Sequence, residues 1–567
     1  MSALRYELIY ATNNRATTLT DGDIYDDIHK QFEFQKQTVL ADKILTNYEK
    51  TYAIRLLIKN YDRDKVMNDD GIRRICKNCY QECLATLYCE YCVRNYLQEN
   101  FPNWTSGNDD IDNLIQECQM ETLVPNVVIE WIPYSNLENT KYLTKGGFSE
   151  IYTADWINGN YDEWDSEKKQ LKRFGNFKVI LKKLENVVSA NQSWFEEAKS
   201  HLTISNKWTD VVQCYGLTQN PSNGNYMLVM MKMDIDLRKY LQQNHNQLTW
   251  KKRINITYEI IHALYYIHDE KAIHRDLHSG NILYSQFNDS WYISDLGFCG
   301  PADKCSTSIY GNLPYIAPEV IVGREHTFAS DIYSIAILMW EISSGQTPFI
   351  NYEHENDIVM NIINGIRPKI VPGTPLEYKN LMKECWDADP LKRPDVIALG
   401  EKMIRINLDY QNMTDELFKS EIDNLEVNKV EENYTSNRLF TSKIHNFENL
   451  PEPKNATEEE QEGFHSKLYD FNIPNNINDF NGSNKQYSDS EKLPKEFIKL
   501  QINSNEIIQQ QMERKDINNI DDNEKEIIQQ KMKRQNIGDI DDEDEVYNNP
   551  NLHSKEQDEL EIPDDGF

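Results

Sequence analysis

The sequence predicts an α+β protein in which a small, sheet-rich lobe precedes a larger helical lobe. Strand-like runs rich in β-branched and aromatic residues come first, at Ile151–Tyr152, Val179–Lys182 and Tyr226–Val229. Apolar residues at helical spacing follow, over Trp250–His268, Phe328–Ser343 and Pro375–Trp386. Strands followed by helices are typical of two packed lobes within one globular segment.

Length and charge restrict the class of protein. The chain has 567 residues, with 60 Lys and Arg against 92 Asp and Glu and a formal net charge of -32. Such a charge repels nucleic acid, so no nucleic-acid partner is expected. No apolar run approaches the roughly 18–20 residues that a membrane span needs, and the polar first residues do not resemble a secretory signal. We therefore expect a cytoplasmic protein without a membrane span, the nucleus remaining an alternative.

The first 137 residues are expected to be largely helical, apart from one cysteine-rich stretch. Residues 1–70 place apolar side chains at helical spacing and contain no proline, which predicts two or three amphipathic helices. Residues 71–104 hold the cysteines. Residues 105–137 are expected to be a linker containing a helix from about Ile111 to Met120, because the polar stretch before it is typical of a helix start.

The cysteine-rich stretch predicts a small zinc module. Four of its cysteines form two Cys-x2-Cys pairs separated by nine residues, namely Cys76, Cys79, Cys89 and Cys92. Two thiolates at this spacing can turn onto one metal ion, and two such pairs complete a tetrahedron, so we expect structural Zn²⁺ here with Cys83 left over. Buried, uncoordinated cysteines are the alternative. A redox site would need only one of the pairs.

Residues 406–567 are expected to form an acidic, mostly disordered tail. From residue 411 onward the chain has 37 acidic against 17 basic residues, with many Asn and Gln. A segment of this composition buries too little apolar surface to fold by itself. A twenty-residue repeat at 506–542 contains two copies of Glu-Ile-Ile-Gln-Gln, which we interpret as a candidate helical docking segment.

Three motifs in the globular segment carry chemistry. They are His274-Arg-Asp-Leu-His-Ser-Gly-Asn281, Asp295-Leu-Gly297 and Ala317-Pro-Glu319. In order and spacing they resemble the catalytic loop, the metal-binding loop and the end of the activation segment of the protein kinases. The resemblance covers residues 138–405. It implies the two-lobed protein kinase fold, with a β-rich N-lobe at 138–230 and a larger helical C-lobe at 231–405.

The resemblance also implies roles for single residues. Lys182 would hold the α- and β-phosphates of ATP and Glu197 would orient it, while Asn281 and Asp295 would bind Mg²⁺ through oxygen atoms. Asp276 would accept the proton of the substrate hydroxyl. The chain is then expected to be a phosphotransferase that uses ATP and Mg²⁺ on protein substrates, with a role in intracellular signal transduction.

The phosphate loop departs from the family pattern. Protein kinases present Gly-x-Gly-x-x-Gly, whereas this chain has Thr144, Gly146 and Ser149 at the three positions. We expect the loop to bind ATP more weakly than three glycines would, because the backbone approaches the phosphates less freely. Ile151 and Met231 are expected to complete the nucleotide site by the same resemblance.

The motifs indicate less directly whether serine, threonine or tyrosine is the substrate residue. His278 and Gly280 stand where serine/threonine kinases carry a lysine and tyrosine kinases an arginine. Asp-Leu-Gly, Gly311-Asn-Leu-Pro-Tyr315 and the ending Cys385-Trp-Asp-Ala-Asp-Pro look most like the tyrosine-kinase-like group, and within it the fungal set with an N-terminal Cys-x-x-Cys module. That group mostly modifies Ser and Thr, so we expect a serine/threonine-protein kinase. The alternative is a pseudokinase scaffold that binds partner proteins through the kinase fold and the zinc module.

Other matches concern structure and regulation. Asp331 stands where the family pins the backbone of the catalytic loop, and Arg393 where an arginine pairs with Glu319. Arg275, directly before Asp276, resembles the arginine onto which a phosphorylated activation segment docks, although it can also simply offset the Asp276 charge. The acceptors in that segment are Ser306, Thr307, Ser308 and Tyr310. An upstream kinase is therefore a candidate partner.

Overall fold

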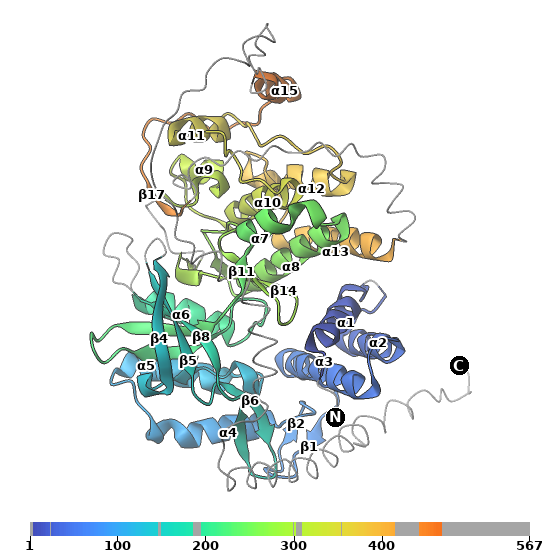
Figure 1. Ribbon diagram of the computed structural model, residues 1–567, viewed down its shortest axis with the longest axis vertical. Helices are drawn as coiled ribbons and strands as arrows, with labels where there is room; N and C mark the ends of the chain where they lie inside the picture. Colours follow the sequence, from blue (N-terminus) through green and yellow to red (C-terminus); the bar gives the residue numbers. More distant parts are fainter. Residues whose placement is uncertain are drawn as a thin grey trace, which may run out of the picture. The chain divides into compact units, whose positions relative to one another are not determined.

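The small lobe is built on a six-stranded sheet in the computed structural model of the chain (Figure 1), which describes residues 4–22, 24–145, 149–184, 194–298, 300–301, 309–352, 354–413 and 441–467. The strands are β3 (Glu130–Trp131), β4 (Leu137–Lys145), β5 (Glu150–Trp156), β8 (Phe177–Lys183), β9 (Cys214–Gln219) and β10 (Tyr226–Met231). Their order in the sheet is β3-β9-β10-β8-β5-β4. All neighbours are antiparallel except β3 and β9. Helix α6 (Trp194–Ser205) packs against this sheet and carries Glu197.

The segment 105–137 contains the expected helix, but it is more than a linker. Helix α5 (Asp109–Glu121) begins where the Asn108 side chain accepts hydrogen bonds from the backbone N–H groups of Asp110 and Ile111. Its apolar side chains Ile111, Leu114, Ile115 and Cys118 are buried in one cluster with residues of α6 and β9. Strand β3 adds an edge to the sheet, and close approach there requires glycine, because a Cβ on Gly216 would lie 1.8 Å from the Glu130 carbonyl oxygen. The segment therefore belongs to the core of the N-lobe.

Three helices form the N-terminal region, as the apolar spacing predicts. They are α1 (Tyr6–Thr18), α2 (Ile28–Ala41) and α3 (Asn47–Asn68). Thr46 and Glu49 make reciprocal hydrogen bonds that start α3. Arg55 of α3 pairs with Glu163 on the hairpin of β6 (Tyr161–Asp165) and β7 (Gln170–Arg173), at 3.1 Å.

The cysteine module follows α3 directly. It consists of β1 (Arg74–Ile75), β2 (Glu82–Cys83) and α4 (Glu90–Asn100). The buried carboxylate of Asp62, on α3, accepts hydrogen bonds from the backbone N–H groups of Thr86 and Leu87 at 2.7 and 2.8 Å. These bonds fix the loop between the two Cys-x2-Cys pairs.

The large lobe is helical. Its helices are α7 (Leu237–Asn244), α8 (Trp250–Asp269), α9 (Pro318–Ile321), α10 (Phe328–Ser344), α11 (Glu355–Ile363), α12 (Leu376–Cys385) and α13 (Val396–Asn412). Short strands carry its loops: β11 (Ile235–Asp236), β12 (Ala272–Ile273), β13 (Ile282–Ser285), β14 (Ser290–Ile293), β15 (Gly300–Pro301) and β16 (Ile309–Gly311). Helix α10 is buried from Ser330 to Ser344, and the other helices gather around it (Figure 1). The α+β, two-lobed expectation is confirmed.

Part of the predicted disordered tail is ordered, which corrects the boundary at residue 406. Helix α13 continues to Asn412, and residues 441–467 contain β17 (Lys443–His445) and α15 (Glu458–Lys467). Strand β17 pairs antiparallel with β16, so that Gly311 lies opposite Lys443. Composition missed this segment because its structure depends on the C-lobe surface against which it packs. The repeat at 506–542 lies outside the described residues.

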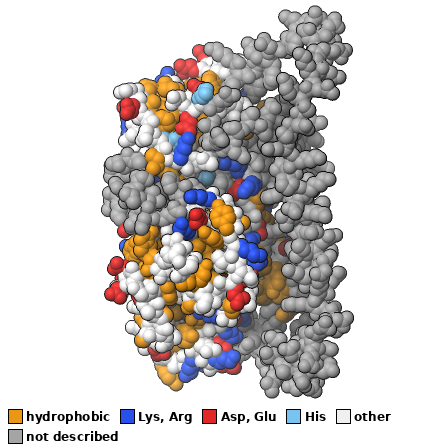
Figure 2. Space-filling model, turned by 60° about the vertical axis from the view of Figure 1, so that its left-hand side comes forward, with side chains coloured by type: hydrophobic (Ala, Val, Ile, Leu, Met, Phe, Trp, Pro, Cys, Tyr) orange, Lys and Arg blue, Asp and Glu red, His pale blue; other side chains and the backbone are white. Residues whose placement is uncertain are grey.

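Figure 2 shows one face of the molecule. Basic and acidic side chains are interspersed there among the described residues, without one continuous basic stripe. Among the described residues, no helix is both long and apolar enough to cross a bilayer.

Candidate active site and cysteine cluster

A buried lysine joins two acidic side chains from different elements. Lys182 lies in β8, between Ile151 on one neighbouring strand and Leu228 on the other. Its Nζ lies 2.7 Å from Glu197 Oε1 on α6 and 2.6 Å from Asp295 Oδ1. The three residues that the sequence predicts as phosphate anchor, orienting acid and metal ligand are thus in direct contact.

The charges in this group stabilise one another. Burial lowers the pKa of Lys182, but the neighbouring carboxylates of Asp295 and Glu197 outweigh it and raise the pKa above its ordinary value. For Asp295, burial raises the pKa, and the Lys182 charge reverses that effect and lowers it. His201, one turn after Glu197 on α6, is 1% exposed, and burial lowers its pKa to about 3. The Lys182 ammonium therefore lies between two acidic side chains, with the buried His201 imidazole nearby.

Helix α10 holds the backbone of the catalytic loop through one buried aspartate, Asp331. The buried carboxylate of Asp331 accepts hydrogen bonds from the backbone N–H groups of His274 and Arg275 at 2.8 and 3.0 Å. It also lies 2.9 Å from His268 Nε2. Arg275 has a positive φ of 69°. Residues other than glycine rarely adopt this backbone conformation, and the hydrogen bonds to Asp331 help to hold it.

Asn281 and Asp295 lie at the same end of the β13–β14 hairpin. Ser294, directly before Asp295, donates its backbone N–H to the Asn281 carbonyl oxygen at 2.8 Å. The Asn281 amide nitrogen donates to the Asp276 carbonyl oxygen at 2.9 Å, which leaves the amide oxygen as the atom available to a cation. A carboxylate and an amide oxygen are ligands that Mg²⁺ prefers. These two residues fit the predicted metal site.

Asp276 is buried and receives hydrogen bonds from two distant parts of the chain. Its Oδ1 accepts from the Asn312 backbone N–H at 3.2 Å and from the Ser442 hydroxyl at 2.9 Å. Ser442 Oγ also lies 3.0 Å from His278 Nε2. Sequence reasoning missed Ser442, because it lies 166 positions from Asp276 in a segment with no motif.

The remaining nucleotide residues lie along the sheet. Thr144 on β4 is exposed and lies opposite Ile151 on β5, and the partly buried Met231 ends β10 opposite Val179. Ser149 directly precedes β5. Gly146 lies outside the described residues, and so do Ser306, Thr307 and Ser308, so their expected roles remain predictions. Tyr310, in β16, is described and is 7% exposed.

A buried ion pair closes the end of the activation segment. The two terminal nitrogens of the Arg393 guanidinium donate to the two carboxylate oxygens of Glu319 at 2.7 Å each. The side chains are 0% and 4% exposed. The pairing expected from the sequence is present, and it fixes α9 to the loop that follows α12.

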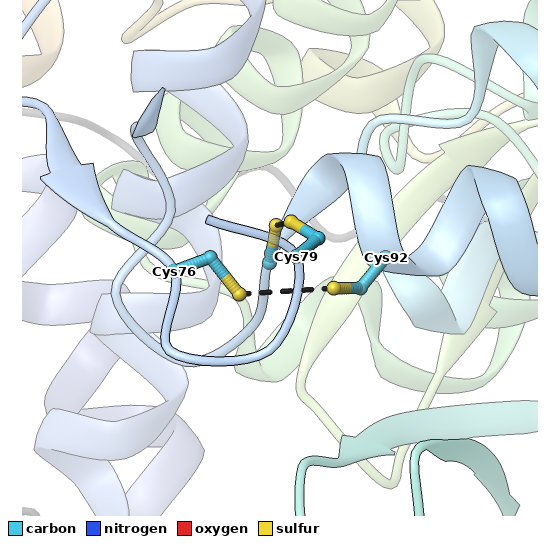
Figure 3. A group of neighbouring side chains, drawn as sticks. Cys76, Cys79 and Cys92 are labelled. Atoms are coloured by element: carbon cyan, nitrogen blue, oxygen red, sulfur yellow. Dashed lines mark hydrogen bonds between the residues drawn. The ribbon is translucent and has the colours of Figure 1, made fainter. Parts of the chain in front are cut away.

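The four predicted zinc ligands form one cluster. The Sγ atoms of Cys76, Cys79, Cys89 and Cys92 all lie within 4.8 Å of one another. Cys76 and Cys92 face each other (Figure 3) at 3.7 Å, and Cys79 and Cys89 are 3.6 Å apart. Four sulfurs 2.3 Å from a central Zn²⁺ would be about 3.8 Å apart, so the cluster fits a tetrahedral site.

Asn78 and Cys83 also make hydrogen bonds at the cluster. Asn78 Nδ2 points to Cys92 Sγ at 3.4 Å, as a donor that stabilises a thiolate. Burial raises the pKa of the Cys92 thiol, and a bound cation would instead favour its thiolate form. The fifth cysteine, Cys83, donates instead to the Arg74 carbonyl oxygen at 3.4 Å.

Comparison with known proteins agrees with the geometry. Residues 137–403 match the family described as protein tyrosine and serine/threonine kinase. The chain is similar to the probable serine/threonine-protein kinase roco5 of Dictyostelium discoideum, with 27% identity over 316 residues, covering 52% of this chain and 10% of that protein.

Two mammalian relatives are similar over a shorter stretch. The dual serine/threonine and tyrosine protein kinase of Mus musculus is 32% identical over 187 residues, covering 32% of this chain and 20% of the relative. The human protein of the same name is 33% identical over 183 residues, covering 32% and 19%. The matches thus span about a tenth to a fifth of the length of these relatives.

Proposed function

This chain belongs to the protein kinase superfamily through residues 137–403, and on that premise we propose that it is an active enzyme that transfers the γ-phosphoryl group of ATP to Ser and Thr hydroxyls of proteins. One observation carries the proposal: Lys182 contacts both Glu197 and Asp295, at 2.7 and 2.6 Å. Phosphoryl transfer depends on positioning and on neutralising phosphate charge, and this group supplies a fixed cation beside a metal-binding carboxylate.

The other residues have matching roles. Asn281 and Asp295 would hold Mg²⁺, which would neutralise the phosphate oxygens during transfer. Asp276 accepts the proton of the substrate hydroxyl. A hydrogen bond from the Asn312 backbone N–H orients its carboxylate. Asp331 keeps the loop that carries Asp276 in its strained conformation.

His278 favours Ser and Thr as acceptors. It lies two positions after Asp276, and its Nε2 lies 3.0 Å from the Ser442 hydroxyl that also contacts Asp276. Ser442 directly precedes β17, which pairs with β16, so a short hydroxyl side chain at this position reaches the carboxylate. The relative named as a probable serine/threonine-protein kinase supports the same direction.

The pseudokinase alternative is less well supported. A silent scaffold needs neither the buried lysine with its acid nor the fixed catalytic loop, yet the chain keeps Lys182, Glu197, Asp276, Asn281 and Asp295 in the arrangement described above. We assign a structural Zn²⁺ to the four-cysteine cluster, with no part in the transfer. A role in signalling follows from protein phosphorylation as a class of reaction.

A transfer assay tests the proposal. Purified chain is incubated with Mg-ATP and a generic peptide library, and phosphorylated residues are identified by mass spectrometry. We expect phosphoserine and phosphothreonine with the wild type and a loss of about 10² to 10⁴-fold with Asp276→Asn, the usual contribution of a general base. Equal, background-level phosphate with both proteins would favour the scaffold, and phosphotyrosine alone would overturn the substrate class.

A further inference from the structure

The structure places a serine of the chain's own C-terminal segment on the catalytic carboxylate. Ser442 Oγ donates to Asp276 Oδ1 at 2.9 Å and lies 3.0 Å from His278 Nε2. A general base must lie within about 2.6–3.2 Å of the proton that it accepts. The Ser442 hydroxyl meets that requirement without any rearrangement.

The backbone around Ser442 is held as a peptide substrate would be. Residues Lys443–His445 form β17, which pairs antiparallel with Ile309–Gly311 of the activation segment. The buried imidazole of His445 also lies 3.0 Å from the Gly311 carbonyl oxygen. Addition of a strand to an exposed edge gives main-chain affinity in many peptide complexes.

Side chains fix the register of this strand. Glu355, at the start of α11, contacts both Lys443 Nζ and His445 Nδ1, the latter at 3.4 Å. The two basic residues stand one and three positions after Ser442, on the same face of the strand. A shift by one residue would break both contacts and would move Ser442 away from Asp276.

The rest of the segment is anchored to the C-lobe. Phe447 and Leu450 pack against its hydrophobic core. Further along, Lys454 donates its backbone N–H to the Ile363 carbonyl oxygen at 3.0 Å, and Gln461 Nε2 donates to the Gly365 carbonyl oxygen at 2.7 Å. Gly365 has a φ of +82°, and a Cβ there would lie 2.2 Å from the Ala456 backbone nitrogen. The surface therefore fits this segment closely.

We propose that residues 441–467 occupy the protein-substrate site and that Ser442 is a phosphorylation site of the chain's own kinase domain, modified in cis. The proposal rests on the proposed function, because it needs an active transferase and Mg-ATP. The Ser442 Oγ–Pγ bond forms as the bond between Pγ and the β,γ-bridging oxygen of ATP breaks. The electron pair leaves with ADP, and the hydroxyl proton passes to Asp276.

Phosphorylation would also change the docking. The phosphate carries about -1.5 to -2 charges, and it would lie beside the buried Asp276 carboxylate. Like charges at that distance repel each other, so the modified segment would bind its site more weakly than the unmodified one. The unmodified segment therefore competes with other protein substrates, and the modified one competes less.

The test follows Ser442 in the full chain. Unphosphorylated chain is mixed with Mg-ATP and a serine-containing peptide, and phosphate at residue 442 and on the peptide is measured by mass spectrometry over a hundredfold range of chain concentration. We expect the fraction modified at 442 per unit time to be independent of concentration, as for two groups held in one chain. Phosphorylated peptide without phosphate at 442 would overturn this inference alone, whereas no phosphate on either would overturn the proposed function too.

A charge swap tests the docking without touching the catalytic residues. Lys443→Glu should slow modification of Ser442 about tenfold, because it places a second negative charge beside Glu355 of α11. The double variant Lys443→Glu with Glu355→Lys should restore the rate, and peptide phosphorylation in Lys443→Glu should not fall. A rate at 442 that is unchanged in Lys443→Glu, or that rises in proportion to chain concentration, would overturn docking in cis.

Discussion

Lys182 Nζ of β8 and Glu197 Oε1 of α6 are 2.7 Å apart, in a pair whose side chains are 10% and 16% exposed. The pair fixes α6 to the sheet and fixes the lysine in the position from which it contacts Asp295. A hydrogen bond between charged, partly buried groups contributes about 1.5–3 kcal/mol.

Replacing the acid of this pair should therefore reduce activity strongly. We expect Glu197→Gln to lower kcat/KM for ATP about 10- to 100-fold, which is about 1.4–2.7 kcal/mol at 1.36 kcal/mol per decade. Asp155→Asn serves as a control, because it removes a more exposed ion pair, at 2.6 Å, with Lys178 of the same strand β8. Steady-state kinetics would contradict the role of Glu197 if both variants lost activity to the same extent.

The cysteine cluster predicts one Zn²⁺ per chain. Elemental analysis of purified protein should find about one equivalent, which should be lost with Cys76→Ser or Cys92→Ser, because three thiolates leave the tetrahedron incomplete. Cys83→Ser is the matched control, since its Sγ contacts the Arg74 carbonyl oxygen and stands outside the group of four. A wild-type protein that is folded and free of zinc would contradict the assignment.

The surroundings of the Asp331 carboxyl predict that the free energy of unfolding depends on pH. Burial raises its pKa, but the hydrogen bond and charge of His268, together with the His274 N–H, outweigh that effect and lower the pKa below its ordinary value. Because the folded state favours the ionised form, the stabilisation is complete above the unfolded pKa of about 3.9 and is lost as the pH falls below it.

The variant Asp331→Asn separates this effect from other acid-sensitive groups. One amide oxygen cannot replace two carboxylate oxygens as acceptors of the His274 and Arg275 N–H groups, so the free energy of unfolding should fall by about 1–3 kcal/mol at pH 7. Denaturant unfolding of both proteins should show this difference unchanged down to about pH 5 and smaller below about pH 4. If the difference in the free energy of unfolding between the two proteins grew toward acid pH, the prediction would be contradicted.

The Glu319–Arg393 pair predicts a loss of stability rather than of chemistry. In Glu319→Gln the guanidinium, whose side chain is 0% exposed, would remain buried without its counter-charge. Breaking a buried pair in this way costs about 3–5 kcal/mol. Thermal or denaturant unfolding measures the loss. Glu384→Gln removes an exposed pair with Lys402 and should change stability by less than about 1 kcal/mol, so equal losses would contradict the argument.

Much of the site could be predicted because its residues are close together in the chain. His274–Asn281 forms one loop, and Asp295 follows it across the β13–β14 hairpin, so a local motif defines most of the geometry. The cysteines are predictable for the same reason, because spacing alone lets each Cys-x2-Cys pair turn onto one metal. Apolar periodicity likewise determined α8, α10 and α12 without help from distant residues.

Only the tertiary structure decided which distant segments meet. The sequence treats 105–137 as a linker, yet α5 is buried against α6 because the N-lobe sheet has an apolar face to cover. Ser442 reaches Asp276 across 166 positions because β17 pairs with β16 and Glu355 fixes its register. Contacts of this kind depend on a surface formed by the folded C-lobe, so composition, which describes the tail as acidic and polar, contains no sign of them.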